Sequence, residues 1–208
     1  MINQVLPRSC RGVRRSECLT NCADARRGQC RYNAFTLIEL IVVVGLIIVL
    51  AGLVLSTVGY ARKKGARARA ETEIAAMSAA CENYKADEGV YPANSDTNAL
   101  NARTSVDPSA YQAASLYLYN ALFGATAGSR TPNTGARSYF VFKPNMLFPA
   151  DQTQTVQYIQ DPFGNSYGYS TIQAATQDTT KGYNPTFDLW STASGTTIGD
   201  APKWIKNW

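Results

Sequence analysis

The sequence predicts an α+β protein in which one long N-terminal helix, membrane-spanning in its first half, packs on a small antiparallel β-sheet. Three observations support this class. The chain of 208 residues holds one long apolar run, and the polar stretch after it keeps a helical stripe of apolar residues. Beyond Val90 the composition shifts to Gly, Ser, Thr, Asn, Gln and Tyr, which is typical of turns and strands.

The apolar run covers residues 35–58, and residues 40–55 include no polar side chain. As a helix the run would be about 36 Å long, enough to cross a hydrocarbon core of about 30 Å. Its one acid is Glu39, at the fifth position. An ionised side chain is costly inside a bilayer, so Glu39 either lies at the interface or meets a partner of opposite charge. The residues alone leave both readings open.

The net charge of +5 comes from residues 1–34, which hold seven Arg against Glu17 and Asp24. The remaining chain has 13 basic and 13 acidic residues, so we predict no nucleic-acid partner. Four of the five cysteines share that segment, at a spacing that matches no familiar zinc pattern. The fifth, Cys81, is expected in the core.

Histidine is absent from the chain. This excludes the nucleophile pairs and the zinc helix that depend on imidazole. A membrane-anchored enzyme would have to use carboxylates, but Asp161, Asp188 and Asp200 show no spacing that suggests a catalytic pair. We predict that the protein is not an enzyme and has no catalytic residue.

The helix is expected to continue beyond the apolar run to the Asp87–Glu88–Gly89 end. Its apolar residues Ile74, Met77, Cys81 and Tyr84 recur at helical spacing and define one buried stripe.

The remaining chain predicts a second helix at 109–123, capped by Asp107 and Pro108 and ended by Gly124. A loop follows at 125–137. Four stretches have the composition of strands, and the sequence DPFGN between the second and third favours a hairpin. The predicted strands are residues 138–143, 155–160, 167–172 and 186–192.

The string AFTLIEL, at residues 34–40, resembles the signal of type IV pilins and type II secretion pseudopilins. The resemblance implies that a prepilin peptidase cuts between Ala34 and Phe35 and N-methylates Phe35, although the family usually has Gly where this chain has Ala34. It also implies that Glu39 serves assembly, because the new amine of Phe35 would meet the acid of a neighbouring subunit. A carboxylate that is costly alone is tolerable beside such a partner.

Further strings resemble the major (G-type) pseudopilin: YKADEGVYP at residues 84–92, DPFGNSYGY at 161–169 and FDLWSTASG at 187–195. The resemblance implies a pilin-like fold and a structural subunit of a type II secretion pseudopilus, which polymerises through its N-terminal helix to drive protein export. A type IV pilin for adhesion, motility or DNA uptake is the alternative. The implied partners are copies of the chain in a filament, the prepilin peptidase, the inner-membrane assembly platform, minor pseudopilins and the membrane.

The expected organisation has four parts. Residues 1–34 are a cytoplasmic leader that is removed, and 35–59 form the transmembrane and assembly helix. Residues 60–89 continue that helix, and 90–208 form a periplasmic α+β domain. The Arg-rich leader favours a single-pass protein of the bacterial inner membrane with its N-terminus in the cytoplasm, and a filament after assembly.

Two features of the sequence allow more than one interpretation. Five basic residues at 62–69 either face Glu71, Glu73 and Glu82 of adjacent copies or form a solvated helix face. The resemblance also raises Ca²⁺ binding after the last strand, where Ser194 replaces an expected carboxylate and Asp200 is the only acid. Because Ca²⁺ prefers several anionic oxygens, no cofactor is predicted, and Ca²⁺ at Ser194 and Asp200 is kept as an alternative.

Overall fold

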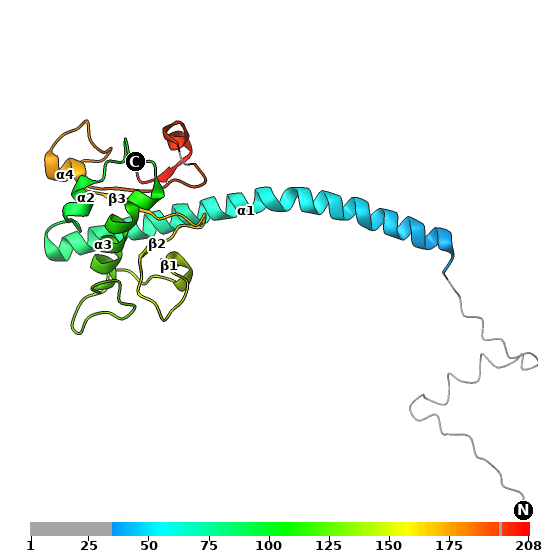
Figure 1. Ribbon diagram of the computed structural model, residues 1–208, viewed down its shortest axis with the longest axis horizontal. Helices are drawn as coiled ribbons and strands as arrows, with labels where there is room; N and C mark the ends of the chain where they lie inside the picture. Colours follow the sequence, from blue (N-terminus) through cyan, green and yellow to red (C-terminus); the bar gives the residue numbers. More distant parts are fainter. Residues whose placement is uncertain (1–34, 196) are drawn as a thin grey trace, which may run out of the picture. The chain divides into compact units, whose positions relative to one another are not determined.

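The computed structural model describes residues 35–195 and 197–208, which fall into two units divided between Gly52 and Leu53 (Figure 1). One helix, α1 (Leu37–Glu88), contributes to both units, and every other helix and strand lies in the second. The architecture is mixed α+β, with a long N-terminal helix whose second part packs on small antiparallel sheets; the α+β class and the long helix are as predicted.

Helix α1 runs for 52 residues. It starts after Thr36, whose hydroxyl accepts the backbone N–H of Glu39 at 3.2 Å. It ends at Gly89, which takes a φ of 79° and donates its N–H to the carbonyl of Lys85 at 2.8 Å. A residue in the left-handed conformation ends a helix, and Gly adopts it at little cost. The predicted continuation of the helix to residue 88 is confirmed.

In the second unit one face of α1 supplies part of the hydrophobic core. Ala70, Met77 and Cys81 are fully buried, and Ile74 is nearly so. Tyr84 is partly buried, with its ring 5.2 Å from that of Tyr139. The stripe predicted from the spacing of apolar residues is therefore the face that packs on the domain.

The helix predicted at 109–123 is present in two parts, a 3-10 turn η1 (Pro108–Tyr111) and α3 (Gln112–Phe123). The first turn is tighter than predicted, because the carbonyl of Asp107 accepts the N–H of Ala110 at 3.0 Å and its side chain accepts that of Ser109 at 2.9 Å. Gly124, at a φ of 74°, ends α3 as expected.

Across residues 35–195 and 197–208, five short strands form two antiparallel sheets. In one sheet β1 (Leu147–Phe148) pairs with β2 (Tyr158–Ile159). In the other the order is β3 (Gly168–Ser170), β4 (Asp188–Ser191) and β5 (Ile205–Lys206), with Trp190 opposite both Gly168 and Lys206. The single predicted sheet is thus replaced by two smaller ones.

The strand predicted at 138–143 is wrong. Tyr139 and Phe140 both donate their backbone N–H groups to the carbonyl of Leu122, at 2.7 and 3.1 Å. Phe140 packs on Phe142, and Phe142 packs on the rings of Tyr119 and Phe123 in α3. The aromatic residues that favour a strand in isolation serve here to close the end of a helix.

The other three predicted strands are present but shorter, as β2, β3 and β4. The third ends early because Thr171 leads into α4 (Ile172–Thr176), which lies against α2 (Ser95–Ala99). The hydroxyls of Thr97 and Thr171 are 2.7 Å apart, and Thr171 donates its N–H to the carbonyl of Thr97 at 3.0 Å. Two 3-10 turns, η2 (Pro144–Met146) and η3 (Ile198–Lys203), complete the elements.

All three tryptophans of the chain lie together, in what we call the tryptophan corner: Trp190, Trp204 and Trp208. The ring of Trp190 is 6.4 Å from that of Trp204 and 6.0 Å from that of Trp208. Trp190 also lies directly over Gly168, where an added Cβ would be 2.2 Å from the indole. The strand pairing at this point therefore requires a residue without a side chain.

Candidate functional site

The first turn of α1 carries the residues that the sequence singles out for processing and assembly. Thr36 caps the helix, and Glu39 is the third helical residue, the spacing of a capping box. An acid here also interacts favourably with the helix dipole. No ion pair or hydrogen bond to the Glu39 carboxylate is present among the described residues, so that carboxylate is free of an intrachain partner there.

The apolar residues after Glu39 are displayed rather than buried. Every residue from Phe35 to Leu55 is exposed, and the large apolar side chains among them keep between 46% and 79% of their surface accessible. By its length and composition, α1 is able to cross a membrane. Ala34, on the other side of the expected cleavage bond, lies outside the described residues.

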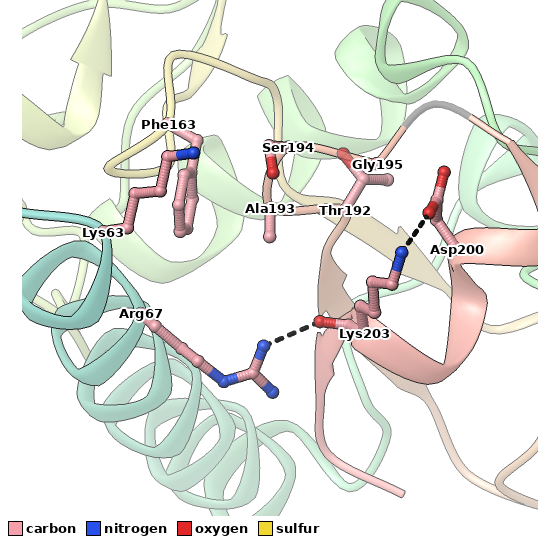
Figure 2. Close-up of a pocket in the computed structure, with 9 residues that line it drawn as sticks. All are labelled: Lys63, Arg67, Phe163, Thr192, Ala193, Ser194, Gly195, Asp200 and Lys203. Atoms are coloured by element: carbon pink, nitrogen blue, oxygen red, sulfur yellow. Dashed lines mark hydrogen bonds and ion pairs between the residues drawn. The ribbon is translucent and has the colours of Figure 1, made fainter. Parts of the chain in front are cut away.

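A second candidate site is a pocket of about 430 Å³ between α1 and the chain that follows β4. Figure 2 shows Lys63 and Phe163 on one side of it, Asp200 and Lys203 on the other, and Arg67 below. The remaining lining residues belong to the chain after β4: Thr192, Ala193, Ser194 and Gly195.

Arg67 connects helix α1 to η3, the segment on the other side of this pocket. Its Nη1 donates to the carbonyl of Lys203 at 2.8 Å, and its Nε lies 3.1 Å from Glu71 on the next turn. Across the pocket, Asp200 accepts hydrogen bonds from Thr197 at 2.7 Å and from the Lys203 ammonium at 2.9 Å. These two donors, Thr197 first, lower the pKa of Asp200 below its ordinary value.

The residues considered for Ca²⁺ do meet at this pocket, but their chemistry does not fit that ion. Both Ser194 and Asp200 line it, and Asp200 supplies the one carboxylate among the described residues of the lining. Both Asp200 oxygens already accept hydrogen bonds, one of them from an ammonium group. Lys63, Arg67 and Lys203 make the surroundings cationic. A site for a hard dication needs several anionic oxygens, so we assign no Ca²⁺ here.

The two buried acids of the sheet region serve as loop anchors. Asp161 accepts the N–H groups of Phe163 and Asn165 at 2.9 and 2.8 Å, and the hydroxyl of Ser191. Asp188 accepts the N–H groups of Tyr183 and Asn184 at 2.9 and 2.8 Å. Burial raises the pKa of each carboxyl group above its ordinary value, and these hydrogen bonds oppose the rise.

Cys81 is the only cysteine among the described residues, and its thiol is free and fully buried. Burial raises the pKa of Cys81 to about 12, so it is held as the thiol. A buried thiol of this kind packs as a small apolar side chain. It carries no functional site.

Sequence reasoning missed the pocket because its two sides are more than 100 positions apart in the chain. The sequence signals were the basic cluster at 62–69 on one side and the Ca²⁺ candidates Ser194 and Asp200 on the other, and nothing in the sequence joined them. The structure now divides that cluster: Arg67 pairs with Glu71 and Arg69 with Glu73, at 3.1 and 2.6 Å within one helix.

Comparison of this chain with models of known protein families, with curated proteins and with solved structures gave no match.

Proposed function

We propose that this protein is a structural subunit of a type II secretion pseudopilus, which polymerises through α1. The observation that carries the proposal is the division of α1 into two surfaces. Its residues from Phe35 to Leu55 expose an apolar surface, whereas Ala70, Met77 and Cys81 are part of the core of an α+β domain. An exposed apolar helix needs a membrane or other apolar helices around it, and a filament axis made of such helices supplies them.

The chemistry of assembly follows from Glu39. Removal of the leader after Ala34 gives Phe35 a cationic amine, and the Glu39 carboxylate of a neighbouring subunit is its partner. The absence of an intrachain partner for this carboxylate among the described residues supports that role. Both charges are desolvated only together, so subunits join in the one register that pairs them.

The alternative, a type IV pilin for adhesion, motility or DNA uptake, uses the same helix. Cys81 is buried and free, so the described residues have no disulfide loop of the kind that major adhesive pilins often carry. This favours the pseudopilin. Deletion of the protein in its native host distinguishes the two, because a pseudopilin is required for secretion and a pilin for motility, adhesion or DNA uptake.

Intact mass spectrometry of the membrane form tests the processing step. The expected mass is that of a chain beginning at N-methylated Phe35. Retention of Met1, or cleavage near Ala61, would contradict the proposal.

Substitution of Glu39 tests the assembly step. Glu39→Ala and Glu39→Gln are both expected to abolish filaments, since each removes the charge that the Phe35 amine requires. Glu71→Gln is the matched control, because it removes an exposed carboxylate of the same helix outside the apolar part. Normal filament yield from Glu39→Gln would show that the pairing of charges is not the basis of assembly.

A further inference from the structure

The first three basic residues after the apolar part of α1 have no carboxylate partner among the described residues. Arg62, Lys63 and Lys64 are all exposed, and no ion pair to any of them is found in the part of the chain that the structure describes. Lys64 instead lies over the ring of Tyr60, 5.4 Å from its centroid. Arg67 and Arg69, one to two turns further on, are paired with acids of the helix itself.

These cations closely follow the apolar run, at the level expected for lipid headgroups when that run spans a membrane. Lys63 is five residues beyond Val58, the last residue of the apolar run, which is about 7.5 Å along the helix. Exposed Tyr60 lies between Val58 and Lys63 in the sequence, and Tyr is enriched at membrane interfaces. Basic side chains beside a membrane span attract anionic lipid headgroups.

Only one of the three unpaired cations also lines the pocket beside the chain that follows β4. Lys63 reaches it from α1, together with Arg67, and Lys203 faces them from η3 (Figure 2). Three cationic side chains thus surround a space that contains one carboxylate, and that carboxylate is already bonded to Lys203. Exposed Ser194 adds a hydroxyl-bearing side chain to the lining, and Phe163 adds an apolar wall. This combination suits a phosphate that carries apolar substituents.

We propose that this pocket binds the phosphate of an anionic phospholipid from the membrane that α1 enters. Lys63 is the primary contact, since no acid among the described residues pairs with its ammonium, and Arg67 positions the opposite wall through the carbonyl of Lys203. The lipid is favoured over other anions because Lys63, which lines the pocket, follows the exposed apolar surface of α1 that includes Leu55. The proposal requires that α1 enter a membrane, and it is independent of filament assembly.

Native mass spectrometry of the full chain in detergent tests the proposal. The protein is titrated with phosphatidylglycerol or with phosphatidylcholine of the same acyl chains, and bound lipids are counted. We expect at least about a fivefold preference for phosphatidylglycerol. Lys63→Gln should reduce it to below about twofold, whereas Lys64→Gln, adjacent but outside the pocket lining, should retain most of it. Lys143→Gln, an exposed cation far along the chain, should leave it unchanged.

Several results would overturn the proposal. Equal binding of the two lipids would remove its basis, and equal losses in Lys63→Gln and Lys64→Gln would indicate diffuse charge rather than a pocket. Displacement of the lipid by millimolar inorganic phosphate would identify a free-anion site instead. Loss of contacts between subunits in Lys63→Gln, without any lipid preference in the parent, would assign the cation to an acidic protein partner. Circular dichroism confirms that each variant folds.

The two proposals fail separately. Glu39→Ala should retain the lipid preference even when filaments are lost, and Lys63→Gln should lose the preference when processing at Phe35 is normal.

Discussion

The phenol of Tyr167 donates a 2.7 Å hydrogen bond to Glu73 Oε2, which joins the start of the sheet region to the helix α1. The other Glu73 oxygen accepts from Arg69 Nε at 2.6 Å, so the carboxylate is held from both sides. Burial, followed by the Glu73 carboxylate, raises the pKa of Tyr167 above its ordinary range and keeps it a donor. This contact is one of the polar links between α1 and the rest of the domain, and the most buried carboxylate of α1 takes part in it.

Tyr167→Phe should therefore destabilise the domain. The change leaves one oxygen of a largely buried carboxylate without its donor, which costs about 1–3 kcal/mol of unfolding free energy. Thermal unfolding followed by far-ultraviolet circular dichroism measures the loss. Tyr84→Phe is the matched control, because the described residues give its hydroxyl no hydrogen bond. Equal stability of the two variants would mean that the bond to Glu73 contributes nothing.

Asp161→Asn should change the dependence of stability on pH. Burial raises the pKa of Asp161 above 3.8, so between that value and the raised one the folded chain holds a proton that the unfolded chain has lost. The contribution of Asp161 to stability is therefore largest below the ordinary pKa and declines as pH rises through this window. The variant lacks the decline, so its stability should rise relative to that of the parent as the pH increases from 3.8 through this window.

Asp151→Asn is a control in which the pKa of the carboxyl group is shifted down rather than up, so the expected change of stability with pH has the opposite sign. Hydrogen bonds from Thr153 lower the pKa of this exposed carboxyl group, so its contribution is present above the ordinary value and is lost as pH falls. Chemical unfolding of the three proteins across this pH range separates the cases. A relative loss of stability in Asp161→Asn on going from acid to neutral pH would show that its hydrogen bonds outweigh its burial.

Gly168→Ala should be strongly destabilising. The new methyl group would lie 2.2 Å from the indole of Trp190, so β3, β4 or the tryptophan corner must shift. Such overpacking costs about 1–3 kcal/mol. Gly65→Ala is the contrasting change, since an added Cβ there meets nothing within 4 Å. It should stabilise α1 by up to about 1 kcal/mol. Melting temperatures that move together would contradict this explanation.

Cys81 should be inert to thiol reagents while the domain is folded. Its thiol is fully buried, and its pKa of about 12 leaves almost no thiolate at neutral pH. The chain beginning at Phe35, incubated with a maleimide, should gain no mass until denaturant is added. Rapid labelling without denaturant would indicate that the core around Met77 and Cys81 opens readily.

The long helix was predictable because its signals are local. The apolar run, the stripe that includes Ile74 and Met77, and the end at Gly89 are each read within a few turns of chain. The cap of α2 is equally local, since Asn94 and Thr97 bond to each other's backbone N–H groups, although no helix was predicted there.

The sheet region was less predictable because its pairings are distant in the sequence. Residues 138–143 have strand-forming side chains, but Leu122 supplies the acceptor that their backbone uses. Thr171 turns into α4 because its partners, Thr97 and Asn98, come from a helix more than 70 positions earlier. The pocket that we propose for a lipid was hard to predict for the same reason. Lys63 can be recognised as a cation in the sequence, but only the fold brings it into one pocket with Ser194 and Lys203.

Because Trp190, Trp204 and Trp208 cluster, the tryptophan fluorescence of the protein reports on one region without an added label. With all three indoles in one place, intrinsic fluorescence records the environment of that region and little else. Circular dichroism, by contrast, is dominated by the 52 residues of α1. A melt in which the two signals diverge would reveal a region that opens while the helix persists, without any label or engineered probe.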